Sequence, residues 1–421
     1  KAKKNFSIVL FFMVVSSFLE IITVVSLIDF VNFLSSNASG KNFLFFEKIL
    51  NSFNLNYDLN DIKLRSYFLI IILILSTSSS LLTIYLSSRF SYITGGEVEA
   101  KLFNFYLSRD YLFHLDTTSS RLLNNIFELA KRVTMFLLEP ILLIMSKLIF
   151  LIPLIIGLII YRPEETIIAC FLFISFYFIF YKIFKKRLSL QGRLETIATE
   201  EKFSTLQEGF GGIKETKILN KYGFFQSKFQ KIYLRLADVW TKKDLIGKTP
   251  KYFIELLTFT TSILLIAFLN QNLNYNFYQI VFNLSFFIIC AYKIIPALQQ
   301  IYLHSTIIRH NIPALDEISS DLINAKNFEL KNSSPINNES KFINFNLISV
   351  KNLSFNYKNS KIPVVKNLSF NIKKGERIAI TGASGSGKTT LIHILSGLIK
   401  QNSGQLRIDN ESIEEHNLQD W

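Results

Sequence analysis

The chain has 421 residues, of which 49% are hydrophobic and only 19% are charged, and its mean hydropathy is +0.30. Soluble domains carry about 25% charged residues, so this composition excludes a wholly water-soluble protein and indicates a large lipid-facing part. The formal net charge of +14 does not indicate nucleic-acid binding, because Lys and Arg concentrate in the cytoplasmic loops of membrane proteins.

Six stretches of the chain are long and apolar enough to cross a bilayer as helices, for which roughly 20 residues are needed. In chain order they are residues 6–34, 66–86, 136–161, 166–184, 252–269 and 277–307. Pro140 and Pro153 interrupt the third stretch, where neighbouring helices would have to satisfy the freed carbonyl groups. The sequence therefore predicts an all-α transmembrane domain of six helices within residues 1–317.

The charges of the connecting segments predict which side of the membrane each segment faces. Residues 182–251 carry sixteen Lys or Arg against seven Asp or Glu, whereas residues 270–275 carry no charge. Because cytoplasmic loops are the ones enriched in Lys and Arg, the basic connections and both chain ends are predicted to be cytoplasmic. Helical apolar spacing continues through these connections, so we expect the helices to extend past the membrane.

The outer connection contains a short aromatic and amphipathic segment, residues 42–51 (NFLFFEKILN). It predicts either an interfacial helix on the outer leaflet or a packed loop helix, with equal weight.

The composition changes after the sixth span. Residues 318–342 are rich in Asn, Ser and Lys, which predicts a linker. From residue 343 the pattern becomes one of short strands, the last of them at 377–381. We expect residues 343–421 to be the first part of an α/β domain that continues past Trp421.

One motif in this region carries chemistry. Residues 382–389 read GASGSGKT, an unbroken match to the phosphate-loop pattern G-x-x-x-x-G-K-[ST]. The motif follows an apolar strand and opens a predicted helix at 388–399, which is the context a phosphate-binding loop requires. The sequence therefore predicts a P-loop NTPase domain.

Each residue type in the motif has a physical role. Gly382, Gly385 and Gly387 would supply tight turns and allow the backbone N–H groups to approach phosphate oxygens. Lys388 would reach the β and γ phosphates as the catalytic cation, and the Thr389 hydroxyl would bind Mg²⁺. Three nearby small polar residues are candidate phosphate donors or, equally, loop filler: Ser384, Ser386 and Thr390.

A phosphate loop does not select a base, so another residue must hold the nucleotide ring. Tyr357 lies 25 residues before the loop, and a Tyr face can stack on adenine. Read locally, an aromatic residue at this position is more often one that ends a strand.

Residues 349–421 resemble the opening of the nucleotide-binding domain of ATP-binding cassette (ABC) transporters. The resemblance rests on the phosphate loop and on four further segments: NLSFNY at 352–357, KNLSF at 366–370, KGE at 374–376 and SGQLRID at 403–409. It implies ATP and Mg²⁺ as cofactors and adenine stacking by Tyr357. Six spans ahead of this domain are similar to exporter-type half-transporters, which implies a second half-transporter as partner, in a homodimer or a heterodimer.

The family pattern continues with elements that these 421 residues do not contain, namely a glutamine loop, the LSGGQ signature, a catalytic Glu and a switch His. We therefore expect hydrolysis to need a longer chain, with the signature supplied by the partner. Two segments are candidates for the coupling helices of such exporters, residues 110–119 and residues 208–223, of which the second resembles the family pattern better.

Ionisable residues within the spans should reveal the chemistry of the cargo, since they are costly in lipid and usually functional. Glu20, Lys251 and Lys293 are such residues. At 1.5 Å per residue, Lys251 and Lys293 share a level near the inner face of the bilayer. They are either a pair of cations for an anionic head group or two lysines that snorkel to the interface.

The segment YKIIPA at 292–297, together with residues 42–51, resembles bacterial flippases for lipid-linked oligosaccharides, whose substrates carry a pyrophosphate. Those flippases have Arg where Lys251 and Lys293 stand. The resemblance implies ATP-driven export or flipping of an amphiphile, such as a lipid-linked oligosaccharide, across the bacterial cytoplasmic membrane. The alternatives are an exporter of lipids, drugs or peptides, a membrane-anchored P-loop kinase or signalling NTPase, and a non-hydrolysing partner subunit.

Overall fold

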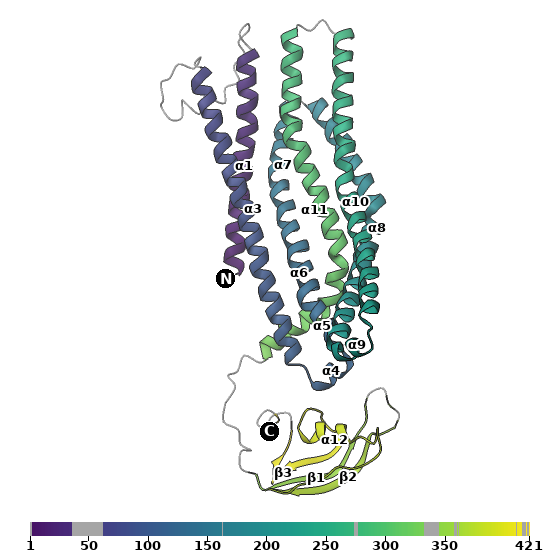
Figure 1. The fold of residues 1–421 in the computed structure, drawn as a ribbon. Helices are drawn as coiled ribbons and strands as arrows, with labels where there is room; N and C mark the ends of the chain where they lie inside the picture. Colours follow the sequence, from purple (N-terminus) through teal and green to yellow (C-terminus); the bar gives the residue numbers. More distant parts are fainter. Residues whose placement is uncertain are drawn as a thin grey trace. The chain divides into compact units, whose positions relative to one another are not determined.

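The computed structural model describes residues 2–35, 62–161, 163–272, 277–331, 345–357, 360, 362–409, 411–414, 418 and 421 (Figure 1). The chain divides into two compact units. The first unit comprises Lys1–Leu102 and Leu123–Leu322, and the second comprises Phe103–Leu122 and Ile323–Trp421.

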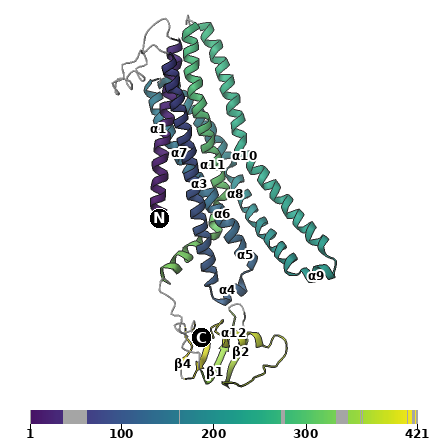
Figure 2. The same cartoon turned by 60° about the vertical axis from the view of Figure 1, so that its left-hand side comes forward.

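Long helices build the first unit, and Figure 2 shows them running side by side. They are α1 (Ala2–Ser35), α3 (Ile62–Leu107), α7 (Glu139–Tyr161), α8 (Pro163–Gly211), α10 (Tyr222–Asn272) and α11 (Phe277–Lys331). α8 packs along α10, and α7 packs against both α1 and α8. Burial of apolar faces between helices holds this unit together, for example where Val24, Phe150 and Ala297 meet between α1, α7 and α11.

Within the described residues, three helical stretches meet the length and hydropathy expected of a membrane span: Lys4–Val31, Ile62–Leu107 and Ser119–Ile160. They overlap the first three predicted spans, and the last three predicted spans fall on α8, α10 and α11. Pro153 lies inside α7 without ending the helix, and Pro140 comes two residues after the π-helical turn at residues 134–138, so the helical run continues through both prolines.

The helices continue well beyond the predicted spans, as the apolar spacing of the connections indicates. α3 reaches Leu107, α8 reaches Gly211, and α10 begins at Tyr222. Short elements connect them: α4 (Tyr111–Asp116), α5 (Ser119–Asn124), α6 (Ala130–Val133) and α9 (Ile213–Ile218), with π-helical turns η1 (Asn125–Leu129) and η2 (Thr134–Leu138) on either side of α6.

Part of the predicted linker is helical instead. α11 continues through the first half of residues 318–342 and ends at Lys331. Ile318 and Ala325 are buried along this stretch, so apolar packing overrides a composition that is typical of a linker. Residues 332–342, and the predicted interfacial segment 42–51, lie outside the described residues.

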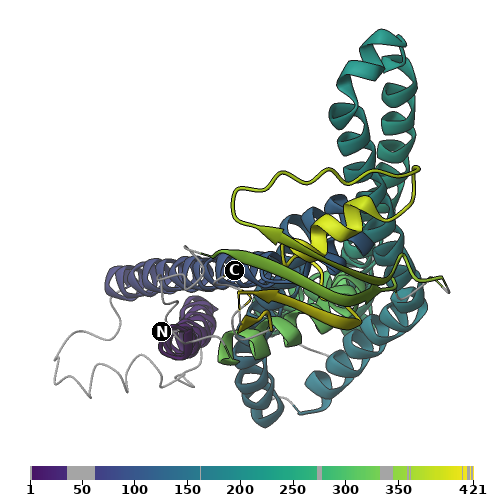
Figure 3. The ribbon, with the colours of Figure 1, turned by 90° about the horizontal axis from the view of Figure 1, so that it is seen from below.

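The second unit contains a small antiparallel sheet with one helix beside it (Figure 3). Its elements are β1 (Leu347–Phe355), β2 (Val365–Lys373), α12 (Lys388–Leu395), β3 (Ser403–Ile408) and β4 (Glu411–Ser412). The strand order is β2-β1-β3-β4, and Val350 of β1 lies opposite Phe370 of β2 and Leu406 of β3. Val350, Leu391 and Leu406 belong to the apolar core between the sheet and α12.

Two predicted elements in this unit differ from the structure. Residues 377–381 form no strand, because no strand within the described residues pairs with them, and Ile378 and Ile380 stay exposed. The predicted helix 388–399 ends at Leu395. Gly397 takes a left-handed φ of 75°, and its N–H donates to the Ile394 carbonyl at 3.0 Å, which terminates the helix.

Candidate functional site

The motif at 382–389 forms a tight loop that leads into α12. Gly387 precedes the helix with a φ of 88°, and Gly382 has a φ of 154°. A Cβ at Gly387 would lie 2.7 Å from the carbonyl oxygen of Val364, and one at Gly382 would lie 2.8 Å from the Ser386 hydroxyl. The positive φ and the close neighbours therefore favour glycine at both positions.

Lys388 is the first residue of α12, and its side chain folds back over the loop. Its ammonium group donates to the carbonyl oxygens of Gly382 at 2.9 Å and Ala383 at 2.7 Å. Thr389, Ser384 and Ser386 are exposed around it. This arrangement fits the predicted phosphate cradle, because an ammonium group and several hydroxyl groups converge on one turn. The phosphate and Mg²⁺ roles of these residues stay predictions.

Tyr357 and Thr390, which the sequence suggests separately, come together in the structure. The Tyr357 hydroxyl hydrogen-bonds the Thr390 hydroxyl, which lies in the first turn of α12, at 3.1 Å. The Tyr357 ring packs edge-to-face on Phe355, with ring centroids 5.0 Å apart. Tyr357 is thus tied to the helix that follows the phosphate loop. The Thr390 hydroxyl is buried and contacts Tyr357, and its role as a phosphate donor stays a prediction.

The first coupling-helix candidate packs against this domain within the second unit. Tyr111 and Leu112 of α4 contact the apolar core of the sheet and α12. The Tyr111 ring lies edge-on to His393 of α12, with centroids 4.9 Å apart. The second candidate, residues 208–223, contains α9 and belongs to the first unit. Sequence reasoning did not predict the Tyr111–His393 contact.

Comparison with known proteins finds a matching protein family for both parts of the chain. The family model of the ABC transporter transmembrane region matches residues 6–292, and the ABC transporter model matches residues 365–421. The chain belongs to the ABC transporter family. The helical unit is therefore the transmembrane region of a multi-pass membrane protein, and the sheet unit holds the start of its ATP-binding domain.

The solved structure of a bacterial Atm1-family ABC exporter with ATP bound matches 99% of this transporter chain and 70% of that chain, with a TM-score of 0.69 and 14% identity. At this identity the likeness shows the fold alone. It confirms the predicted architecture, which is a helical transmembrane domain in an exporter-type arrangement followed by a partial α/β P-loop domain.

Curated relatives match the ATP-binding part of the transporter. The energy-coupling factor protein EcfA1 of Oenococcus oeni is 43% identical over 72 residues, or 17% of this chain and 26% of that protein. The colicin V secretion/processing protein CvaB of Escherichia coli is 36% identical over 74 residues, or 18% of this chain and 11% of that protein. The chain spans about a quarter of the length of the EcfA1 relatives it matches.

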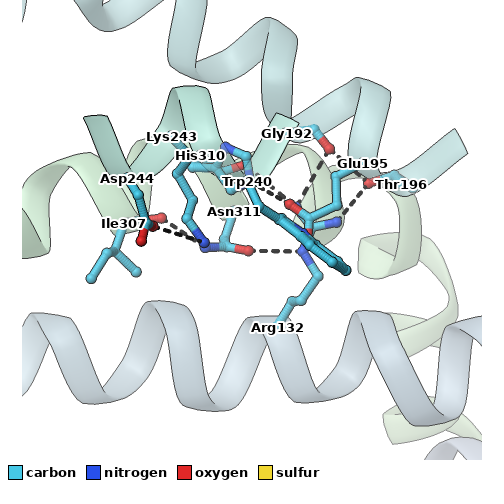
Figure 4. Close-up of polar contacts among 10 residues, drawn as sticks. All are labelled: Arg132, Gly192, Glu195, Thr196, Trp240, Lys243, Asp244, Ile307, His310 and Asn311. Carbon is cyan, nitrogen blue, oxygen red and sulfur yellow. Dashed lines mark hydrogen bonds and ion pairs between the residues drawn. The ribbon is translucent and has the colours of Figure 1, made fainter. Parts of the chain in front are cut away.

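A buried ionic network joins several helices of the transporter's first unit (Figure 4). Arg132 of α6 is its centre and is only 4% exposed. The guanidinium donates from Nε to Asn311 Oδ1 at 2.8 Å and from Nη1 to Thr196 Oγ1 at 3.0 Å. Its Nη2 lies 3.8 Å from the Glu195 carboxylate. These contacts connect α6 with α8 and α11 and leave the buried charge well satisfied.

Glu195 of α8 has three partners in this network. Arg132 and His310 flank its carboxylate, and the Trp240 indole N–H of α10 donates to it at 3.1 Å. Burial raises the pKa of the Glu195 carboxyl, but the His310 hydrogen bond, the Arg132 charge and the Trp240 hydrogen bond outweigh burial and lower this pKa to about 2. Glu195 is therefore ionised at neutral pH. Sequence reasoning missed the network, since its members are up to 179 positions apart.

Lys293, one of the two predicted substrate lysines, lies on a cavity. The cavity has a volume of about 240 Å³ and lies between α1, α7 and α11. Its polar lining residues are Glu20, Lys147, Tyr292, Lys293 and Gln300. Lys251 is half-exposed on α10 and pairs with Glu255 one turn along the helix, at 3.7 Å. Lys251 is not among the residues that line this cavity, and the role of the two lysines as a cation pair stays a prediction. The sequence analysis did not select Lys147 as a candidate cargo-binding residue, although it is an ionisable residue within the third predicted span.

Proposed function

We propose that this chain is the membrane part and the first portion of the ATP-binding part of an ATP-driven exporter of amphiphiles. One observation supports it above the others: a phosphate-loop domain follows a transmembrane region of the ABC family in one chain. The family match over residues 6–292 argues against a membrane-anchored kinase or signalling NTPase. The match with CvaB is limited to 74 residues and carries no information on cargo.

In this proposal ATP and Mg²⁺ bind at the loop before α12, and Mg²⁺ supplies neutralising charge at the β and γ phosphates. Lys388 exchanges its carbonyl acceptors on Gly382 and Ala383 for phosphate oxygens, which are stronger partners for an ammonium group. The Thr389 hydroxyl is exposed at the start of α12, where it can hold the metal. Tyr357 offers its ring to adenine from a position fixed by Thr390.

α4 is the element that would transmit the state of this site. Tyr111 contacts His393, which lies on the helix that begins at Lys388. A displacement of α12 on nucleotide binding would therefore act directly on Tyr111. The proposed partner is a second half-transporter, identical or not, which supplies the signature segment. The proposed location is a bacterial cytoplasmic membrane with both chain ends inside, supported by the basic connections.

For the cargo we propose an amphiphile with a phosphate-bearing head group, and a lipid-linked oligosaccharide as its specific form. The support is Lys293, which the structure places on a cavity between membrane helices. An ammonium group in such a place is costly unless an anion or water satisfies it. The exposed, paired Lys251 contributes less support to this cargo.

The test is ATP turnover by the full-length protein in liposomes, with and without a polyprenyl-pyrophosphate oligosaccharide. We expect basal turnover that the lipid stimulates, and a loss of at least about a hundredfold in Lys388→Ala, because the loop cation stabilises charge developing on the phosphates. Lys400→Ala, in the same domain but outside the loop, is the matched control. Intact turnover in Lys388→Ala would show that the loop assignment is wrong.

A further inference from the structure

A group of positive charges lies on α8 at the end of the fourth predicted span, residues 166–184. We call it the α8 basic cluster, and it consists of Lys182, Lys185, Lys186 and Arg187. All four side chains are exposed. Residues 166–194 contain no Asp or Glu, and none of the four cations forms an ion pair within the part of the chain that the structure describes. α8 therefore carries four positive charges here that no carboxylate neutralises.

The neighbouring helix α10 also carries lysines beside its membrane span, but these lysines are paired. Nζ of Lys242 lies 2.5 Å from an Asp238 carboxylate oxygen, and Nζ of Lys248 lies 3.1 Å from an Asp244 oxygen, each one turn along the helix. Carboxylates among the basic residues are compatible with a cytoplasmic location, because Asp and Glu contribute little to membrane orientation. Membrane orientation therefore does not by itself require a cluster without any carboxylate, as on α8.

The packing of α8 on α10 gives the depth of the cluster in the membrane. Phe180 of α8 and Phe253 of α10 contact each other, with ring centroids 5.8 Å apart, near the end of the fourth predicted span and the start of the fifth. At 1.5 Å per residue, Lys182 and Arg187 lie about 3 Å and about 10 Å beyond Phe180 along α8. The head-group layer beside the hydrocarbon core is about 5 to 7 Å thick. The cluster therefore lies at the depth of lipid phosphates.

An apolar face of α8 leads directly into the cluster. Phe171 and Phe178 are 70% and 63% exposed. Lys182 and Lys185 follow Phe178 after four and seven residues, so all four side chains lie on one side of the helix. A lipid whose acyl chain lies along the two phenyl rings would have its head group at the lysines. This face thus combines the two chemistries of a phospholipid in the right order.

We propose that this face of α8 binds an anionic phospholipid of the adjacent leaflet, which is the inner leaflet in the proposed orientation. The α8 basic cluster holds the head group, and each Lys or Arg at an anionic membrane surface contributes about fivefold in affinity. The ligand is a lipid of the bilayer and not the cargo, so the inference goes beyond the proposed export function. α8 continues to Gly211, so the bound lipid would hold the base of this cytoplasmic extension.

The test is photocrosslinking of the full-length protein in liposomes without ATP. The probes are diazirine-bearing phosphatidylglycerol, which is anionic, and phosphatidylcholine with the same acyl chains, which is zwitterionic. Mass spectrometry of peptides measures how much of each lipid labels α8. We expect phosphatidylglycerol to label wild-type α8 at least about tenfold more. The double variant Lys185→Gln with Lys186→Gln should lower this preference at least about fivefold, and added salt should lower it as well.

Two further variants separate the effect of charge at this site from other effects. Lys185→Arg with Lys186→Arg keeps both charges and should keep the wild-type preference. Lys242→Gln with Lys248→Gln is the matched control, because it removes the same charge from the paired lysines of α10. This control should leave the labelling of α8 unchanged.

Three outcomes would overturn the lipid site. The first is equal labelling of wild-type α8 by both lipids, and the second is an equal loss of preference in the α10 control. The third is wild-type α8 without any lipid label, which would show that another protein surface covers this face. ATP turnover in liposomes tests the export function separately. Protein with the expected lipid preference but no turnover would contradict export alone, and turnover without the preference would contradict the lipid site alone.

Discussion

At the scale of single residues, the Arg132–Glu195–His310 network shows how a buried charge is retained in the helical unit. Arg132 reaches Asn311, Thr196 and Glu195, so each of its nitrogen atoms has an acceptor close by. Replacing Arg132 or Glu195 removes one partner of a buried ion pair, which typically costs about 3 to 5 kcal/mol. Sequence patterns could not predict this, because α6, α8, α10 and α11 bring the residues together only in the folded chain.

The lowered pKa of Glu195 predicts a pH dependence of stability. The carboxyl has a pKa of about 2 in the folded protein against an ordinary 4.5, so its stabilising effect is complete above about pH 4.5 and is lost as the pH falls towards 2. We expect the melting temperature of Glu195→Gln to lie below that of the wild type at neutral pH and to converge with it on acidification. Thermal unfolding in detergent, repeated from neutral pH to acidic pH, measures the melting temperatures of the wild type and of Glu195→Gln. A difference in melting temperature that stays the same at every pH would contradict the lowered pKa of Glu195.

At the scale of elements, the approach of α8 to α11 depends on a glycine. A Cβ at Gly192 would lie 1.8 Å from the backbone carbonyl oxygen of His310, which no side-chain movement can relieve. The two helices are therefore as close as their backbones allow, and this closeness lets Arg132 contact the carbonyls of both Gly192 and His310.

Gly192→Ala should force α8 and α11 apart and destabilise the protein by about 3 kcal/mol, the upper range for overpacking a tight site. The matched control is Gly96→Ala on α3, where a Cβ would meet no atom within 4 Å. That variant should be neutral or slightly stabilising, since Ala favours a helix over Gly by about 1 kcal/mol. Thermal unfolding measures the stability of both variants. Equal melting temperatures of Gly192→Ala and Gly96→Ala would show that moving α8 and α11 apart does not destabilise the protein.

At the scale of the whole molecule, the contact between α4 and α12 predicts how cargo and ATP communicate. Tyr111→Ala removes the ring that faces His393, so we expect the ratio of cargo-stimulated to basal ATP turnover to fall severalfold. Leu115→Ala on the same short helix is the matched control, because Leu115 is 49% exposed. The assay is turnover in liposomes with and without the cargo lipid. An unchanged ratio in Tyr111→Ala would exclude α4 as the transmitting element.

The sequence by itself determined the class of this protein. The apolar spans, the basic connections and the unbroken motif at 382–389 are each local patterns. Such patterns can be recognised in the sequence without knowledge of the fold. They were sufficient for a helical membrane domain followed by a partial α/β P-loop domain, whereas the roles of the phosphate-loop residues stay predictions. They failed at residues 377–381 and over the helical first half of the predicted linker, where pairing and packing with distant residues decide the local structure.

Only the tertiary structure decided which distant residues meet. Lys147 joins Glu20 and Lys293 around one cavity, whereas Lys251, at the same predicted depth, pairs with Glu255 on its own helix. Depth along a helix can be counted from the sequence, but the face that each helix presents is set by packing against its neighbours. The physical reason is that burial and ionic contact depend on three-dimensional proximity, which a one-dimensional pattern does not contain.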